Sequence, residues 1–162
     1  MSKKTNIRTA TKNDIEQIVP LLIALDELHV KMYPTVFDSS KIKFNIRKSF
    51  LLDNIDKPDN LILLAESNKN IIGIVHYYIQ KTINHPIKKD KKVAVLSDLY
   101  VDENYRNKGI AQQLINKGLE SIKENWLVNN VVLNVFNKNQ DAIKLYEKSG
   151  FQKQFIRYSI SI

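Results

Sequence analysis

A change of apolar spacing near residue 105 constrains the fold of this chain more than any other feature of its sequence. Three β-rich segments precede the change, at residues 61–66, 71–83 and 92–101, and polar turns separate them. Strand-like runs that follow one another across short turns are typical of β-hairpins. The three segments therefore predict an antiparallel meander.

After the change, apolar residues repeat at a spacing of three and four, which predicts a helix. The residues of this repeat are Ile110, Leu114, Ile115, Leu119 and Ile122. A strand is expected next at residues 131–136, then a helix at residues 141–149, closed by Gly150, where a left-handed cap is usual. Because strand–helix–strand crossovers place their strands in parallel, the second half should add a parallel pair to the sheet.

The two ends of the chain complete the expected element order, β-α-α-β-β-β-α-β-α-β. A short strand at residues 7–10 leads into residues 11–14, which resemble a capping box at the start of a helix. Pro20 should kink that helix or introduce an irregular turn. A second helix is expected to begin at residue 39 or 40, and a last strand should span residues 151–162.

Length and composition limit the class of protein. A chain of 162 residues suggests one α+β domain over residues 1–162, and 43% hydrophobic residues argue against disorder. The absence of cysteine excludes disulfides, a thiolate zinc site and a cysteine nucleophile, and no metal site is predicted. No apolar run resembles a signal peptide or membrane span, so we expect a cytoplasmic protein without a membrane partner.

The net charge of +8 has three candidate meanings: a nucleic acid, an anionic membrane surface or an anionic cofactor. The basic residues are nearly all lysine, because arginine occurs only at positions 8, 47, 106 and 157. No arginine cluster with interleaved aromatic residues is present, so we expect no nucleic-acid partner. The lysine-rich run at residues 88–92 is interpreted as a solvated hairpin tip.

The most informative segment is residues 98–111, which passes from a strand through a turn into a helix. Arg106, Gly109 and Ala111 are spaced there as Arg-x-x-Gly-x-Ala. The first amides of a helix lack partners within it, and the helix dipole adds positive potential. Small residues let an anion approach the backbone, and Arg106 and Lys108 add charge. The pattern favours a pyrophosphate site, although an ordinary helix start with a packing glycine has the same spacing.

This turn resembles the acyl-coenzyme A-binding motif of the GNAT superfamily of N-acetyltransferases. The family's later signature, Asn-x-x-Ala-x-x-Leu-Tyr-x-x-x-Gly-Phe, is matched by Asn139, Ala142, Leu145, Tyr146, Gly150 and Phe151. The order of elements agrees over nearly the whole chain. The resemblance implies a GNAT-type acyltransferase fold: a central mixed, mostly antiparallel sheet with a splayed parallel strand pair, flanked by about four helices.

The resemblance also implies acetyl-coenzyme A (acetyl-CoA) as the cofactor. Its pantetheine arm would lie between the splayed strands, against the backbone of Leu99 and Val101. Asn139 would contact the cofactor, and the small side chain of Ala142 would leave room for it. The pyrophosphate would bind the backbone of the turn, at Arg106, Asn107, Lys108, Gly109, Ile110 and Ala111.

Two positions are candidates for the chemistry. Tyr146 matches the family's usual general acid, which would give a proton to the departing thiolate when an amine attacks the thioester. Relatives often carry a catalytic Glu followed by Asp before the cofactor motif, but here the pair is Ser97-Asp98. Asp98 is the candidate base or an anchor for a cationic substrate, with His76 and Glu27 as other candidates. Neighbouring strand residues face opposite ways, so Asp98 does not automatically replace a Glu at 97.

The acceptor end is expected where the first two helices connect, because aromatic side chains gather there. The candidate substrate-binding residues are Glu27, His29, Tyr33, Phe37 and His76. Acidic residues in this region could attract an amine, although Asp26 is expected to lie on a solvated helix face.

These observations favour an enzyme that transfers an acetyl group from acetyl-CoA to a primary amine in a ternary complex. The expected acceptor is a small amine such as a polyamine, an amino acid derivative or an antibiotic. A protein N-terminus or lysine is the alternative acceptor. A non-catalytic basic domain that binds nucleic acid is the contrasting class, supported by the net charge of +8. A relative that only binds acyl-CoA is a third possibility, because Ser97 departs from the family pattern. A homodimer is also possible.

Overall fold

The computed structural model describes residues 5–87 and 89–160, and its strands form one sheet in the order β1-β2-β3-β4-β5. The strands are β1 (Asn6–Thr9), β2 (Asn60–Ser67), β3 (Asn70–Thr82), β4 (Lys91–Val101) and β5 (Val131–Leu133). Neighbouring strands pair antiparallel except β4 and β5, which pair in parallel. The predicted meander and the predicted parallel pair are both confirmed.

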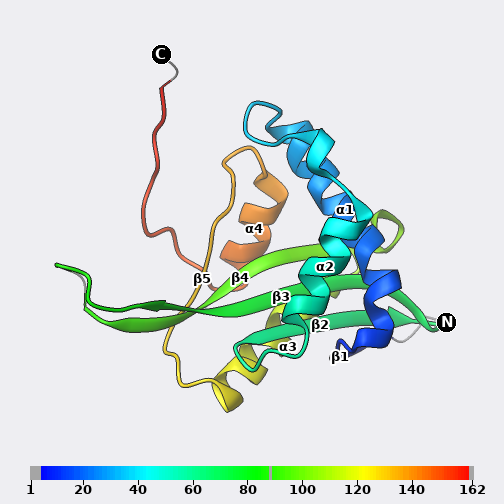
Figure 1. Ribbon diagram of the computed structural model, residues 1–162, viewed down its shortest axis with the longest axis horizontal. Coiled ribbons are helices and arrows are strands. Elements are labelled where there is room, and N and C mark those ends of the chain that lie inside the picture. Colours follow the sequence, from blue (N-terminus) through cyan, green and yellow to red (C-terminus); the bar gives the residue numbers. More distant parts are fainter. Residues whose placement is uncertain (1–4, 88, 161–162) are drawn as a thin grey trace.

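Helices cover both faces of this sheet. The α-helices are α1 (Ile15–Met32), α2 (Phe44–Asn54), α3 (Ile110–Asn125) and α4 (Gln140–Lys148). Single 3-10 turns are η1 (Lys12–Asp14), η2 (Ser39–Lys41) and η3 (Glu103–Tyr105). Helices α1 and α2 lie on one face, α3 lies on the other, and α4 lies beside the end of β5 (Figure 1).

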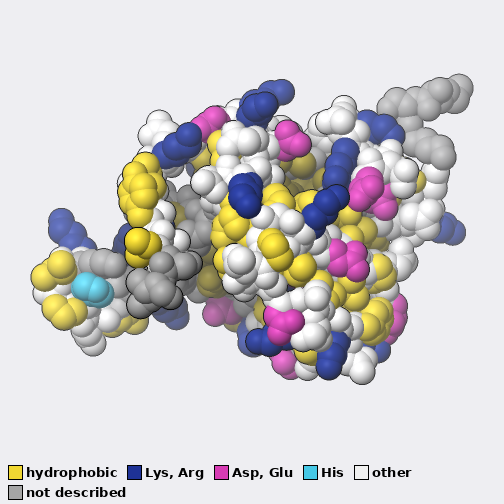
Figure 2. Space-filling view, turned by 90° about the horizontal axis from the view of Figure 1, so that it is seen from above, with side chains coloured by type: hydrophobic (Ala, Val, Ile, Leu, Met, Phe, Trp, Pro, Cys, Tyr) yellow, Lys and Arg dark blue, Asp and Glu magenta, His cyan; other side chains and the backbone are white. Residues whose placement is uncertain are grey.

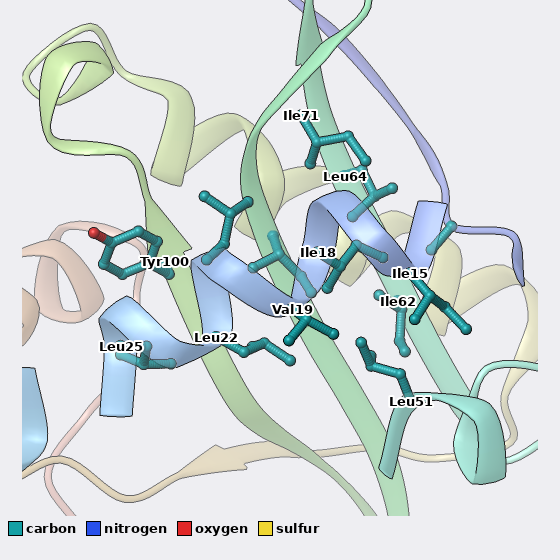
Figure 3. Close-up of a cluster of buried hydrophobic side chains, with 13 residues drawn as sticks. Ile15, Ile18, Val19, Leu22, Leu25, Leu51, Ile62, Leu64, Ile71 and Tyr100 are labelled. Atoms are coloured by element: carbon teal, nitrogen blue, oxygen red, sulfur yellow. The ribbon is translucent and has the colours of Figure 1, made fainter. Parts of the chain in front are cut away.

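The core between α1 and the sheet fixes the position of that helix. Ile18, Val19 and Leu22 of α1 are at most 1% exposed and pack with Leu64 of β2 and Leu51 of α2 (Figure 3). Full burial of each such side chain contributes about 1.5–3 kcal/mol. A second buried cluster joins the other face of the sheet to α3 through Leu114 and Ile115 and to α4.

The structure corrects two expectations about the first two helices. Helix α1 continues through Pro20, so of the two alternatives predicted there, a kink or an irregular turn, the irregular turn is absent. Pro20 is exposed, so water can reach the carbonyl that its missing N–H leaves unpaired. Helix α2 begins at Phe44 instead of residue 39 or 40, because Asp38 accepts a 2.9 Å hydrogen bond from the Ser40 amide and holds η2 as a separate turn.

The strands of the second half are shorter than predicted. Strand β5 ends at Leu133 instead of residue 136, and residues 151–160 form no strand, while residues 161–162 lie outside the described part of the chain. A strand needs a neighbouring edge, and β5 offers only three residues. The C-terminal segment instead runs away from the body (Figure 1), and Phe155 and Tyr158 are 72% and 88% exposed.

The smaller structural predictions are confirmed. Gly150 has φ of 91° after α4, and the Phe151 amide donates to the Tyr146 carbonyl at 3.0 Å, as in a left-handed helix cap. Residues 89–92 are exposed at the base of the long β3–β4 hairpin loop, while Lys88 lies outside the described residues.

Asp14 ties the start of α1 to β1. Its carboxylate accepts hydrogen bonds from both Nη atoms of Arg8, at 2.7 and 2.8 Å, and from the Thr11 amide at 2.8 Å. The hydrogen bonds from Arg8, which outweigh the effect of burial, hold the pKa of Asp14 well below its ordinary value.

We expect Asp14→Asn to lower the free energy of unfolding by about 1–2 kcal/mol at pH 7, since it removes a charge-assisted pair. Because the folded pKa is depressed, this stabilisation is complete above the unfolded pKa of about 3.9 and disappears as pH falls below it. Urea unfolding at pH 7 and near pH 3 measures both effects. An equal deficit at the two pH values would contradict the role of the charge.

Candidate functional site

Strands β4 and β5 are paired over only three positions and then separate. The paired residues are Ala94 with Val131, Val95 with Val132, and Leu96 with Leu133. Strand β4 continues to Val101, whereas the chain beyond Leu133 leaves the sheet. The predicted splayed pair is therefore present in the structure, and it opens beyond Leu96.

A bulge lies at the point of separation. His76 of β3 is opposite Asp98 and Tyr77 is opposite Leu96, so Ser97 has no partner in the ladder. An extra residue in one strand reverses which residues face each side of the sheet. As a result, Asp98 is buried on the face of α1 and α2, whereas Leu99 packs on the face of α3. Ser97 itself is exposed.

The bulge also determines which backbone groups of β4 face the opening. The Asp102 amide donates to the Ile72 carbonyl of β3 at 2.9 Å. Backbone groups alternate in direction along a strand, so those of Leu99 and Val101 point away from β3, toward the gap. The Val101 carbonyl there accepts a 2.9 Å hydrogen bond from Arg106 Nε. This geometry agrees with the predicted role of Leu99 and Val101.

The turn after β4 presents backbone amides at the start of α3. Asn107 and Gly109 both have positive φ, at 60° and 76°, and Gly109 is the N-cap of α3. The first intrahelical bond runs from the Gln113 amide to the Gly109 carbonyl at 3.0 Å. The amides of Ile110, Ala111 and Gln112 therefore have no acceptor within the helix. The space around the Gly109 Cα is open, which leaves room for an anion.

The basic side chains of this turn are held by the protein. Arg106 donates to the Val101 carbonyl, and its guanidinium carbon lies 5.2 Å from the centre of the Tyr100 ring. Lys108 Nζ donates to the Asn104 carbonyl at 3.0 Å and lies 5.1 Å from the centre of the Tyr105 ring. Both side chains shape the turn and give it positive charge, while the backbone amides are the groups left for an anion.

On the face shown in Figure 2, lysine and arginine side chains are scattered among acidic residues and form no single patch. No helix within residues 5–87 and 89–160 is long and apolar enough to cross a membrane.

Helix α4 places the signature residues beside the gap. Asn139 is its N-cap, and the Asn139 Oδ1 atom accepts a 3.3 Å hydrogen bond from the Ala142 amide. Tyr146, one turn from the helix end, packs at a steep angle on Phe151, with ring centres 5.8 Å apart. Burial, together with the negative charge of Asp98, raises the pKa of Tyr146 to about 12. Its hydroxyl therefore keeps its proton at neutral pH.

Asp98 is enclosed by three partners. Its Oδ2 atom accepts a hydrogen bond from Ser97 Oγ at 2.9 Å and contacts His76 Nδ1 at 3.3 Å, while Oδ1 lies 3.8 Å from Arg47 Nη2. Burial alone would raise the pKa of Asp98, but the hydrogen bond from His76, the charge of Arg47 and the hydrogen bond from Ser97 lower it below its ordinary value. A carboxylate paired in this way is a weak proton acceptor at neutral pH.

Arg47 joins Asp98 to the substrate end of the site. Its guanidinium binds both carboxylate oxygens of Asp26, with Nε to Oδ2 at 2.7 Å. The expectation of a solvated Asp26 is therefore wrong, because α2 brings a guanidinium against α1 at that position. Glu27, the neighbouring candidate, is exposed. The only sequence signal for Arg47 was its identity, as one of four arginines in a lysine-rich chain.

His76 is occupied by protein groups on both ring nitrogens. Besides the contact of Nδ1 with Asp98, its Nε2 lies 2.8 Å from Asn60 Oδ1. Asn60 Nδ2 in turn donates to Asp59 Oδ1 at 3.0 Å, so Asn60 is itself held by a neighbour. His76 is only 3% exposed. His76 positions Asp98, and neither of its ring nitrogens is left for the predicted contact with substrate.

The other three substrate candidates come together at one end of the gap. His29 stacks on Phe37 at 5.3 Å between ring centres, and Tyr33 lies 4.3 Å from Phe136. Tyr33 donates to Asn137 Oδ1 at 2.5 Å and accepts from the Lys138 amide at 2.8 Å. These contacts join the end of α1 to the segment between β5 and α4, and they add Phe136, which the sequence analysis did not assign to the site.

Comparison with known proteins gives the family. A family model described as the acetyltransferase (GNAT) family matches residues 22–151. The chain belongs to the GNAT acetyltransferase family. Its fold class and its membership, both predicted from the two motifs, are confirmed. The GNAT family uses acetyl-CoA, so this chain is an N-acetyltransferase of a family that takes its acetyl group from that cofactor.

Several relatives of this GNAT protein cover almost its whole length. The N-acetyltransferase YhfO of Bacillus subtilis (strain 168) is 25% identical over 97% of each chain. An N-alpha-acetyltransferase of Sulfurisphaera tokodaii is 25% identical over 93% of this chain and 82% of that protein. A crystal structure of a mutant BH1408 protein from Bacillus halodurans has a TM-score of 0.86 at 25% identity, covering 97% of this chain and 99% of that one.

Proposed function

We propose that this protein transfers the acetyl group of acetyl-CoA to the primary amine of a small molecule. The splay between β4 and β5 supports the proposal, because it leaves the Leu99 backbone without a β5 partner on the strand that leads into the amide turn at the start of α3. The amides of Ile110 and Ala111 would hold the pyrophosphate of the cofactor. The backbone of Leu99 would bind the pantetheine arm like an added strand.

Acetyl transfer requires attack by a neutral amine on the thioester carbon and departure of the coenzyme A thiolate. Tyr146 is the donor toward that sulfur, since it holds its proton and lies on α4 beside the gap. Asp98, with its pKa lowered, supplies a fixed negative charge behind the site. The guanidinium of Arg47, 3.8 Å away, partly balances that charge.

The contacts across the acceptor end favour a small acceptor over a folded protein. Tyr33 bridges α1 to Asn137 and Lys138, and Phe37 and Phe136 lie beside it with ring centres 5.4 Å apart. These contacts join the two sides of that end, and a small amine could bind beside the rings. The relative named N-alpha-acetyltransferase makes a peptide N-terminus the second candidate acceptor.

A panel of amines tests the proposal, with release of free coenzyme A thiol as the readout. The panel contains polyamines, amino acid derivatives, aminoglycosides and peptides with free N-termini. We expect turnover with at least one small amine and little with peptides. Turnover confined to peptides would shift the assignment to a protein acceptor, and no amine-dependent thiol release across the panel would refute the transferase activity.

A negative charge at the amide turn should weaken cofactor binding. We expect Ala111→Asp to raise the Kd for coenzyme A at least about tenfold, since repulsion of a pyrophosphate at ~4 Å costs about 1–4 kcal/mol. A carboxylate in the first turn of a helix is favourable to the helix, but Ala111 is partly buried against the core, so thermal melting of the variant checks that the fold persists. Asn116→Asp, an exposed position further along α3, is the matched control. Calorimetric titration with equal affinities for both variants would remove this turn from the cofactor site.

A further inference from the structure

His29 lies at the acceptor end, and neither of its ring nitrogens makes a hydrogen bond within residues 5–87 and 89–160. It lies on the last turns of α1, half-buried, stacked on Phe37 and 6.4 Å from Phe136 between ring centres. Histidines at such positions usually bind a protein partner through at least one nitrogen, as His76 does here. His29 therefore has two nitrogens available to a ligand in the aromatic end of the site.

The carboxylates nearest the gap already bind protein partners. Asp98 accepts from Ser97 and contacts His76 and Arg47, and Asp26 is bound on both oxygens by Arg47. Glu27 is exposed on α1, outside these contacts. The reaction nevertheless needs a proton acceptor, because a primary amine is charged at neutral pH and must lose a proton before it attacks.

We propose that His29 is the general base that deprotonates the acceptor amine. This inference rests on the proposed acetyltransferase function and names a group of the same site that the family motifs do not include. It also defines the acceptor: an ammonium group that enters beside Phe37 and Phe136, whose ring faces favour a cation before its proton is removed.

The ammonium N–H gives its proton to a ring nitrogen of His29, and the freed lone pair attacks the thioester carbon. The carbon–sulfur bond breaks with its electron pair on the sulfur, to which Tyr146 donates a hydrogen bond. The attacking nitrogen gives up its second proton to the thiolate by way of water, which leaves a neutral amide and a free thiol. His29 then releases its proton to water, so that the neutral ring is restored for the next turnover.

The surroundings of His29 suit a base that works at neutral pH. Burial lowers its pKa below the ordinary histidine value, so the ring is neutral and able to accept a proton. Three charged groups act on it from the packed elements: Asp26 on α1 and Asp98 on β4 stabilise the protonated ring, while Arg47 on α2 opposes it. The two carboxylates thus stabilise the protonated form of His29 that exists during turnover.

The test compares His29→Gln with the same substitution at His85, an exposed residue of the β3–β4 hairpin. At pH 7, kcat/KM for an active amine should fall by about 10²-fold in His29→Gln and stay unchanged in His85→Gln. The pH–activity profiles of the unmodified enzyme and of His29→Gln should also differ in shape. The unmodified enzyme should lose activity as pH falls through the lowered pKa of His29, which is below the ordinary histidine value of about 6.5, whereas His29→Gln should gain activity steadily with pH as more amine becomes neutral.

A weakly basic acceptor distinguishes a general-base role of His29 from a role in packing alone. With an arylamine or a hydrazide that is already uncharged at pH 7, the deficit of His29→Gln should largely disappear. A deficit of equal size at every pH and with both acceptors would overturn the proposal and leave His29 as a structural residue. If the unmodified enzyme acetylates no amine, the proposed function has failed, whereas unchanged pH profiles in an active His29→Gln enzyme refute only the base.

Discussion

Tyr146→Phe should lower kcat for acetyl transfer by about 10²–10³-fold, the range typical of a lost acid in catalysis. The substitution removes only the hydroxyl that faces the departing sulfur. The ring, which packs on Phe151, is retained, so the fold and the gap between β4 and β5 should persist. The Kd for coenzyme A should therefore change little.

The pH dependence of this deficit follows from the raised pKa of Tyr146. A phenol with a pKa of about 12 stays protonated throughout the working range, so the deficit should be nearly constant from pH 6 to 9. An ordinary thiol has a pKa of about 8.5. Tyr146 therefore stabilises the thiolate mainly as a hydrogen-bond donor, and water can complete the proton transfer.

Steady-state rates of Tyr146→Phe measure kcat, and titration with coenzyme A measures its Kd. Tyr158→Phe, at an 88% exposed position of the C-terminal segment, is the matched control and should behave like the unmodified enzyme. Unchanged turnover in Tyr146→Phe would remove this hydroxyl from the mechanism.

Gly118→Ala should destabilise the protein by about 2 kcal/mol, although alanine is the better helix former. A Cβ at this position of α3 would lie 2.3 Å from Cε2 of Tyr77, which is completely buried. Overpacking of a core costs about 1–3 kcal/mol and sometimes more, against a gain of about 1 kcal/mol in helix propensity. The clash outweighs the gain, because neither α3 nor the central strand β3 is free to move.

The melting temperature should fall by about 5–10 °C in Gly118→Ala, measured by circular dichroism. A double-mutant cycle with Tyr77→Leu identifies the cause. Tyr77→Leu alone leaves a cavity and is itself destabilising, but it provides the space that the new methyl group needs. The cost of Gly118→Ala should therefore shrink in the Tyr77→Leu background. An unchanged cost would show that the contact with Tyr77 is not its origin.

Local sequence patterns predicted the parts of the fold that depend on neighbouring residues. The polar turn after β2, the helical repeat of α3 and the cap at Gly150 each rely on backbone preferences within a few residues. The errors occurred where a segment needs a distant partner. Residues 151–160 have the composition of a strand, yet only the three-residue edge of β5 was available to pair with them.

The functional site likewise combines features that are encoded locally with features that need distant partners. The amide turn at Gly109 and the position of Tyr146 follow from two short motifs, and both were predicted without any contact being known. The network of Asp98 could not be predicted, because Arg47 and Asp26 reach it from two helices that are separated from β4 by many residues. The bulge at Ser97 is equally invisible in the sequence, since it depends on the register with β3.

The sequence by itself therefore determined the family, the strand–turn–helix whose amides are left unpaired, and the position of the tyrosine of the second motif. These features are encoded by consecutive residues, whose spacing fixes their geometry once a helix or turn forms. Only the tertiary structure decided the surroundings of the charged groups. It paired Asp26 and Asp98 with Arg47 and His76, and among the described residues it left the ring nitrogens of His29 without a hydrogen bond, because burial and contacts between distant segments determine which groups can hold or accept a proton.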